Sequence, residues 1–338
     1  MSQPVAQGFR LSPQQRRLWS LQKEAEGFPY RARAVARIEG RLDRAALAAA
    51  LEDVAARHEI LRTTFPKLPG LSLPAQAIRE TGALRLEEED LSSRAPEERD
   101  ALLDLLWEEL GERPFQPDRE PPVVLTLVSL TPEDHRLFIA AHALAADAAA
   151  LEVLVRDLAR AYGREETEEP AQYADVAEAL NELLESEETE AGREFWREAG
   201  PLTVGRLPLE RQTEEAGFTP QAVAMDADPA ILAAAQELAE RRSVPLAAVP
   251  LAAWHAVLRR FAAEEVSPRS VVAVELAGRH YEGFESALGL FARSLPLAVA
   301  VEYDLPFADL VSRAGERLEA AGDWQDYFSW EALPIGYV

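Results

Sequence analysis

Residues 139–151 read Ile139-Ala-Ala-His142-Ala-Leu-Ala-Ala-Asp147-Ala-Ala-Ala-Leu151, an apolar stretch that carries one histidine and one aspartate. The apolar run of residues 136–141 predicts a buried strand, and residues 147–162 predict a helix with a carboxylate at its N-terminus. A strand–turn–helix unit therefore holds both ionisable groups, which need partners when they are buried. Two interpretations stay open at this point. His142 is either a core histidine bonded to backbone, with Asp147 as an N-cap, or part of an active-site remnant at the end of a strand.

On both sides of this unit, hydrophobic spacing predicts alternating strands and helices, and therefore an α/β (α+β) fold. The predicted strands are residues 35–40, 60–65, 123–130, 136–141, 218–225, 270–276 and 295–302. The predicted helices are residues 10–22, a helix capped by Asp43, and residues 97–110, 147–162, 229–242, 246–261 and 307–321. Ser12 with Gln15 predicts a capping box at the first helix. The acidic run Glu87 to Asp90 is interpreted as a solvated loop.

The length of 338 residues predicts two domains, at about 150 residues per domain. Residues 1–170 are expected to form an N-terminal lobe that carries the His142 segment. Residues 171–200 form a Glu-rich helical pattern and are predicted to connect the lobes. Residues 201–338 begin with an irregular segment and then form a second α/β block.

The charge of the chain limits its partners. It has 35 Lys and Arg against 59 Asp and Glu, a net charge of −24, which argues against nucleic acids and membrane surfaces. It contains no Cys, so disulfides, thiolate metal sites and a Cys nucleophile are excluded. No signal peptide is visible, and the apolar stretch of residues 137–155 carries too many ionisable groups to span a membrane. A soluble, cytoplasmic protein is expected.

Common motifs for cofactors and catalysis are missing from the sequence. Neither a G-x-G-x-x-G nor a P-loop pattern occurs, and the residues around Ser286 do not have nucleophile-elbow spacing. No metal site is expected, because no two histidines share a helical turn. The histidines are residues 58, 135, 142, 255 and 280.

Five ordered segments resemble the condensation domains of nonribosomal peptide synthetases. The segment Arg57-His-Glu-Ile-Leu-Arg-Thr-Thr-Phe65 matches the family motif R-H-E-x-L-R-T-x-F without a break, and so includes Arg57, His58 and Arg62. The other four matches are residues 12–19 with Arg17 (S-x-A-Q-x-R-L-W), residues 172–175 (Q-Y-x-D), Gly278-Arg279 followed by residues 289–297 (G-R…G-x-F-V-N-T-L-P-L), and residues 325–328 (Q-D-x-P-F).

The resemblance implies two chloramphenicol-acetyltransferase-like lobes arranged in a V. In the family, phosphopantetheine arms of donor and acceptor carrier proteins enter a tunnel from opposite faces, and an amide forms between their substrates. The implied partners are peptidyl or acyl carrier proteins and an adjoining adenylation domain. No cofactor is expected to bind directly, because the phosphopantetheine arms arrive as part of the substrates.

The family motif H-H-x-x-x-D-G aligns with His142, Ala143, Asp147 and Ala148. Ala143 therefore replaces the histidine credited with catalysis in the family, and Ala has no proton acceptor. By resemblance, His142 and Asp147 are structural, and Asp147 is expected to form an ion pair with Arg279 across the lobes.

Two functional hypotheses follow. The chain is either a condensation domain with impaired or non-standard amide formation, or a catalytically inactive scaffold that docks carrier, adenylation or tailoring domains. Complete condensation domains continue beyond the Q-D-x-P-F segment, so the second lobe is expected to be incomplete. A free-standing acetyltransferase that uses coenzyme A is disfavoured, because it would still require a histidine base.

Overall fold

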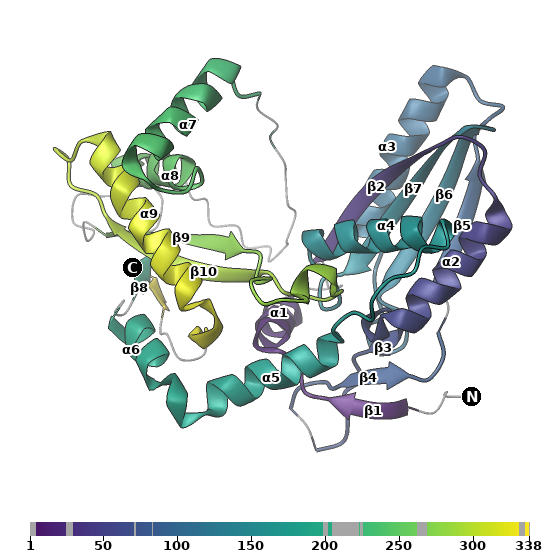
Figure 1. Ribbon diagram of the computed structural model, residues 1–338, viewed down its shortest axis with the longest axis horizontal. Helices are drawn as coiled ribbons and strands as arrows, with labels where there is room; N and C mark the ends of the chain where they lie inside the picture. Colours follow the sequence, from purple (N-terminus) through teal and green to yellow (C-terminus); the bar gives the residue numbers. More distant parts are fainter. Residues whose placement is uncertain are drawn as a thin grey trace. The chain divides into compact units, whose positions relative to one another are not determined.

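The computed structural model describes residues 5–24, 30–70, 72–82, 84–198, 202–204, 223, 226–261, 269–330 and 335–337. The chain divides into two units (Figure 1). Unit 1 comprises Met1–Glu182 with Ala277–Ala292, and unit 2 comprises Leu183–Leu276 with Arg293–Val338. Residues 277–292, which the sequence places in the second lobe, therefore belong to unit 1. No helix in the described ranges is both long and apolar enough to cross a membrane.

Unit 1 is built on a four-stranded sheet in the order β2-β7-β6-β5. These strands are β2 (Arg31–Glu39), β7 (Asp134–His142), β6 (Val123–Thr131) and β5 (Arg85–Asp90). The predicted antiparallel hairpin is β6 with β7. The interpretation of Glu87 to Asp90 as a loop was wrong, because these residues form edge strand β5, parallel to β6. An edge strand tolerates such charge because Glu88, Glu89 and Asp90 remain exposed to water and Glu87 is only half-buried.

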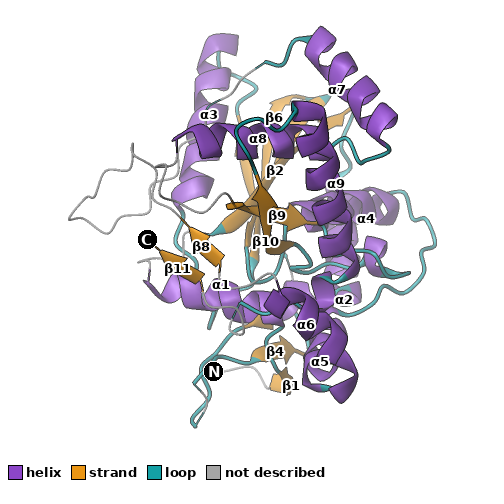
Figure 2. Ribbon diagram, turned by 90° about the vertical axis from the view of Figure 1, so that its left-hand side faces the viewer, coloured by secondary structure: helices purple, strands orange, loops and turns teal. Residues whose placement is uncertain are grey.

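Helices cover both faces of this sheet (Figure 2). Because strand side chains alternate between faces, Leu125 and Leu127 join one core cluster, which also contains buried residues of α2 (Arg44–Arg57) and α4 (Ala148–Tyr162). Val124 and Val128 join another cluster, against α3 (Pro96–Glu112). The long apolar runs of β6 and β7 are thus explained by burial on both sides.

A second, small sheet in unit 1 has the order β1-β4-β3, with β1 (Val5–Phe9), β4 (Gln76–Arg79) and β3 (Thr63–Thr64). The first half of the predicted strand at 60–65 is the 3₁₀ turn η1 (Glu59–Arg62), where Leu61 N–H donates to the His58 carbonyl at 3.1 Å. Helix α1 (Pro13–Glu24) follows the predicted capping box. Gln15 N–H donates to Ser12 Oγ at 3.1 Å and Ser12 N–H to Gln15 Oε1 at 2.9 Å, which confirms the box.

The connector is two helices rather than one. Helix α5 (Tyr173–Glu185) ends before the 3₁₀ turn η2 (Glu187–Thr189), and α6 (Glu190–Glu198) follows. The N–H of Ser186 still donates to the Leu183 carbonyl at 3.2 Å, in the i−3 pattern of a tightening helix end. The predicted single helix is therefore interrupted at 186–189.

Unit 2 pairs β9 (Arg269–Leu276) with β10 (Arg293–Ala300) in antiparallel register, and β8 (Leu202–Val204) with β11 (Ile335–Tyr337) in parallel. Its helices include α7 (Pro229–Arg242), α8 (Ala248–Phe261) and α9 (Phe307–Asp323), and the 3₁₀ turn η4 (Gln325–Tyr327) follows α9. Trp196 of α6 lies in this core, and its indole N–H donates to the Trp324 carbonyl at 2.8 Å. The predicted strand at 218–225 lies outside the described residues, apart from Val223.

Candidate functional site

The motif segment lies where strand β7 ends and helix α4 begins. The last residue of β7, His142, pairs with Arg31 of β2, and its N–H donates to the Pro122 carbonyl at 2.8 Å. Helix α4 starts at Ala148 with Asp147 as its N-cap. Gln15 of helix α1 stabilises the turn between them, because its Nε2 donates to the Leu144 carbonyl at 2.7 Å. The two ionisable groups are therefore fixed at the joints of a strand–turn–helix unit.

The His142 ring is buried, with a relative exposure of 1%. Its Nδ1 accepts the Leu144 N–H at 3.1 Å, and the ring meets Phe115 edge-on with centroids 5.7 Å apart. Burial, with a smaller contribution from the charge of Arg31, lowers the pKa of His142 to about 4. The ring is therefore neutral at pH 7, and because Nδ1 accepts a hydrogen bond its proton sits on Nε2. In this tautomer neither nitrogen is available as a base.

Ala143 is half-buried, whereas the residues on both sides of it are buried. Its N–H donates to the Tyr30 carbonyl at 3.2 Å and so continues the β2–β7 pairing by one bond. The side chain is a methyl group with no proton donor or acceptor. The motif position where the family has its catalytic histidine is thus partly open but carries no acid–base group.

The Asp147 carboxylate is the centre of a hydrogen-bond network inside unit 1. Its Oδ1 accepts the Ala150 N–H at 2.7 Å, which caps α4. Its Oδ2 accepts two further backbone N–H groups, those of Phe291 at 2.8 Å and Ala292 at 2.9 Å. Both bonds join segments that are more than 140 residues apart in sequence.

Arg279 completes this network. Its Nη2 lies 3.2 Å from Asp147 Oδ1, and the side chains of both residues are less than a tenth exposed. Its Nη1 donates to the Phe284 and Ala287 carbonyls at 2.7 Å each, and the guanidinium lies over the Phe291 ring, 4.1 Å from its centroid. The contact expected across lobes therefore lies within unit 1, because residues 277–292 belong to it.

Tyr173 contacts the loop of residues 289–292, which also binds Asp147. The Tyr173 hydroxyl donates to the Leu290 carbonyl at 2.6 Å and lies 2.8 Å from Ser12 Oγ. A Cβ at position 289 would lie 2.0 Å from Tyr173 Cδ2, so only glycine allows this approach. Three of the segments that match the family, residues 12–19, 172–175 and 289–297, thus meet around one loop.

The remaining motif residues contact other parts of unit 1. His58 Nε2 lies 2.8 Å from Asp157 Oδ2 in a buried pair between α2 and α4, and the Arg57 guanidinium donates to the Glu168 carbonyl at 2.8 Å. Arg62 donates to the carbonyl of Arg79, and Arg17 lies exposed on α1. None of these contacts involves the His142 turn.

Sequence reasoning missed Asp157 as the partner of His58. The two residues are 99 positions apart, and only the packing of α2 on α4 brings them together. Burial opposes ionisation of Asp157, but the hydrogen bond and charge of His58 prevail and lower its pKa. A lone acidic residue between the apolar positions Leu154 and Leu158 was the available signal.

Nothing in the described part of the chain assembles three or more His, Asp or Glu side chains that could hold a metal ion. The arrangement at the turn instead consists of one neutral imidazole, one methyl group and one fully engaged carboxylate. The geometry supports a rigid frame around position 143, without a proton acceptor there.

Sequence comparison decides the family. The condensation-domain family model matches residues 5–328. The chain belongs to the condensation-domain family. Its relatives include tyrocidine synthase 2 of Brevibacillus parabrevis, 30% identical over 324 residues that cover 94% of this chain and 9% of that protein. The dimodular nonribosomal peptide synthase of Bacillus subtilis (strain 168) is 32% identical over 341 residues, covering 94% of this chain and 14% of that protein.

Solved structures with the same fold support this family assignment. The X-domain from teicoplanin biosynthesis is 29% identical with a TM-score of 0.81, covering 99% of this condensation-family chain and 76% of the X-domain chain. SgcC5 from Streptomyces globisporus is 26% identical with a TM-score of 0.78, covering 93% of this chain and 73% of that one. The predicted mixed α/β fold and the resemblance to peptide-synthetase condensation domains are thereby confirmed. The chain spans only a small fraction of the synthetases that it matches.

Proposed function

We propose that this condensation-family domain serves a nonribosomal peptide synthetase as a docking scaffold for carrier-bound intermediates and for a tailoring partner, without imidazole-based amide formation. The observation that carries the proposal is the methyl group of Ala143 at the half-buried motif position. Loss of a general acid–base group lowers a rate by about 10²- to 10⁴-fold. His142 is not a substitute, because its Nδ1 is occupied and burial keeps its pKa low.

The hydrogen-bond network around Asp147 and Arg279 has a structural role that does not require catalysis. Asp147 binds three backbone N–H groups and Arg279 within unit 1, which holds the turn and the loop of residues 284–292 in one arrangement. A stable frame of this kind can present a surface to other proteins even when no bond is made. A second solved structure, 30% identical to this chain, is the complex of the X-domain and OxyB from teicoplanin biosynthesis. A protein partner of this chain is consistent with that likeness.

Slow amide formation is the second candidate function, and two observations favour it. Position 143 is partly open, and the Asp147–Arg279 ion pair that the family resemblance implies is present in this chain. Positioning two tethered substrates can lower a barrier by about 7–11 kcal/mol without a base. An α-amine with a pKa of about 7.7–8.0 is also partly deprotonated near neutral pH. Peptidyl or acyl carrier proteins would deliver both substrates on phosphopantetheine arms, with no cofactor bound by the domain itself.

A product assay with loaded donor and acceptor carrier proteins separates the two candidates. The scaffold proposal predicts that the wild-type domain forms amide no faster than a reaction without the domain. Ala143→His tests whether the frame supports catalysis once a base is restored, and Ala143→Gln controls for added bulk and polarity. Wild-type product above the no-domain background would overturn the scaffold proposal.

Binding is measured in parallel, because an inactive scaffold must still recognise its partners. Loaded carrier protein is titrated against the wild-type domain and against Ala143→Gln. Saturable binding with no turnover supports the scaffold. Absence of both binding and turnover would contradict both candidate functions.

A further inference from the structure

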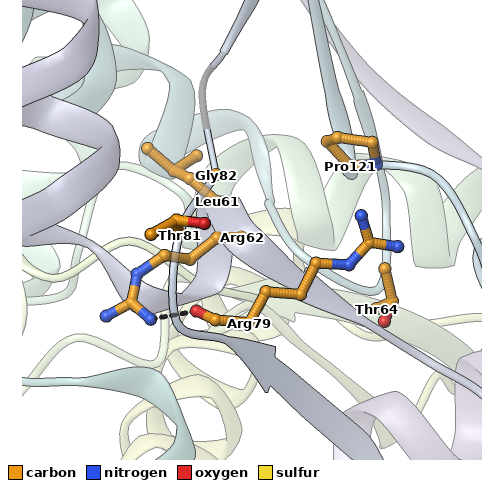
Figure 3. A pocket seen from close by; sticks show the side chains of 7 residues that line it. All are labelled: Leu61, Arg62, Thr64, Arg79, Thr81, Gly82 and Pro121. Carbon is orange, nitrogen blue, oxygen red and sulfur yellow. Dashed lines mark hydrogen bonds between the residues drawn. The ribbon is translucent and has the colours of Figure 1, made fainter. Parts of the chain in front are cut away.

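One cavity in unit 1 lies apart from the His142 turn and has a cationic lining. It has a volume of about 150 Å³. Its lining contains two arginines, two threonines, two apolar residues and one glycine, and no carboxylate is among the described lining residues. The lining residues are Leu61, Arg62, Thr64, Arg79, Thr81, Gly82 and Pro121 (Figure 3). The chain has a net charge of −24, yet the described lining of this cavity includes two arginines and no acidic residue.

Strand pairing explains why these side chains gather. In the β3–β4 ladder Thr63 pairs with Ile78 and Thr64 with Ala77, so the next pair along the register is Arg62 with Arg79. Side chains two positions apart share a face of a strand. Arg62, Thr64 and Arg79 therefore start from the same side of the small sheet, and from there the two arginine side chains extend in opposite directions (Figure 3). Two of these residues belong to the Arg57–Phe65 motif, whose role the proposed function leaves unexplained.

The two arginines are engaged differently. Arg62 donates through Nη1 to the carbonyl of Arg79, and its Nη2 lies 3.3 Å from Glu59 Oε1, so its charge has a carboxylate partner. Arg79 donates through Nη2 to the carbonyl of Arg119, which orients the guanidinium without neutralising it. Among the described residues no carboxylate lies within ion-pair distance of Arg79. In Figure 3 the Arg79 side chain extends toward Thr64 and Pro121.

The walls of the cavity are fixed by packing. Leu61 and Thr64 are buried, and a Cβ at Gly82 would lie 2.8 Å from the Arg62 Cβ, so the loop closes on the arginine stem only with glycine there. Pro121 precedes Pro122, whose carbonyl receives the His142 N–H. The cavity is thus rigid on several sides and adjoins the segment that anchors the motif strand.

We infer that this cavity binds a phosphate-sized oxyanion, with the Arg79 guanidinium as its charged anchor. A guanidinium offers five N–H donors in a planar fork, and it binds phosphate oxygens through paired, charge-assisted hydrogen bonds. One bond to the Arg119 carbonyl leaves Arg79 most of that capacity. A bound oxyanion would supply the negative charge that the described lining lacks.

The test is a titration with inorganic phosphate at constant ionic strength, followed by NMR shifts of the Thr64, Arg79 and Gly82 amides. The wild-type protein is expected to show saturable shifts at these amides. Arg79→Met is expected to weaken binding by about tenfold or more, the loss of a charge-assisted bond. Arg119→Met is the matched control, because its exposed side chain adds the same charge nearby without lining the cavity.

Two further variants keep the outcome decisive. If Arg79→Met does not fold, Arg79→Lys retains the charge but loses the planar fork and is expected to bind several-fold more weakly. Thr64→Val is a second control and is expected to leave binding unchanged, because the Thr64 hydroxyl donates to the Ala77 carbonyl. Shifts that never saturate, or equal losses in Arg79→Met and Arg119→Met, would overturn the inference. A parallel titration with phosphopantetheine identifies the source: tighter binding than inorganic phosphate indicates a phosphate ester, and equal binding indicates the free ion.

Discussion

Replacing Asp147 with alanine tests the frame of unit 1 most directly. The substitution removes the acceptor of three backbone N–H groups, those of Ala150, Phe291 and Ala292. It also leaves the Arg279 guanidinium, 9% exposed, without its carboxylate. Desolvated groups that lose their partner keep the cost of burial and lose the compensating bond.

The size of the effect follows from these contacts. Loss of an N-cap costs about 0.5–2 kcal/mol, and removal of one partner of a buried ion pair costs about 3–5 kcal/mol. The two terms overlap because one carboxylate serves both, so Asp147→Ala is expected to lower the free energy of unfolding of unit 1 by about 3–5 kcal/mol. Asp147→Asn caps equally well but carries no charge, and we expect it to lose about 1.5–3 kcal/mol.

The assay is urea unfolding followed by hydrogen exchange and mass spectrometry, which reads unit 1 and unit 2 peptides separately. The loss is expected in unit 1, with faster exchange at the Phe291 and Ala292 amides. Asp43→Ala is the matched control. Asp43 is an exposed N-cap whose side chain accepts the Ala45 and Ala46 N–H groups, so its loss should cost about 1 kcal/mol.

A double-mutant cycle with Arg279→Met completes the test. Residues that share one ion-pair network show interaction energies of about 0.5–3 kcal/mol. The double variant should therefore lose less stability than the sum of the single losses. Strict additivity, or a loss for Asp147→Ala no larger than for Asp43→Ala, would refute the assignment of Asp147 as the centre of the frame.

Three further predictions concern the same unit. The His142 ring should titrate near pH 4 in an NMR titration, and a ring that titrates near pH 6.5 would contradict this. Because the unfolded imidazole takes up its proton first, near pH 6.5, the free energy of unfolding should fall by up to about 3 kcal/mol between pH 6.5 and pH 4. Gly289→Ala should displace Tyr173 and cost about 1–3 kcal/mol in thermal unfolding; an unchanged Tm would argue against the close approach. Asp157→Asn should cost about 1.5–3 kcal/mol by removing the charged partner of buried His58, and urea unfolding with a loss below about 1 kcal/mol would disagree.

Local patterns predicted much of the fold. The β6–β7 hairpin, the Asp147 N-cap and the Ser12–Gln15 capping box follow from hydrophobic runs and from residue types at helix starts, which act over a few positions. The errors have the same origin. The acidic residues of β5 have no strand signal of their own, and they form a strand because β6 offers a hydrogen-bonding edge.

The candidate site was only partly predictable. Ala143 was identifiable from the motif alone, because the absence of an imidazole is a property of one residue. The two backbone bonds of Asp147 to Phe291 and Ala292 carry no side-chain signature at the receiving end, so no sequence pattern could predict them. The pairing of His58 with Asp157 likewise depends on the packing of α2 against α4.

The sequence by itself determined the alternation of strands and helices, the family and the missing proton acceptor, because each is written in residue types over short spans. Only the tertiary structure decided that residues 277–292 join unit 1 and that Asp147 accepts the N–H groups of Phe291 and Ala292. It also decided that Arg62, Thr64 and Arg79 line one cavity. These features depend on strand register and on the burial of groups more than ten residues apart. Burial makes an unpartnered charge costly, and that cost, rather than any local preference, selects the partners that the folded chain brings together.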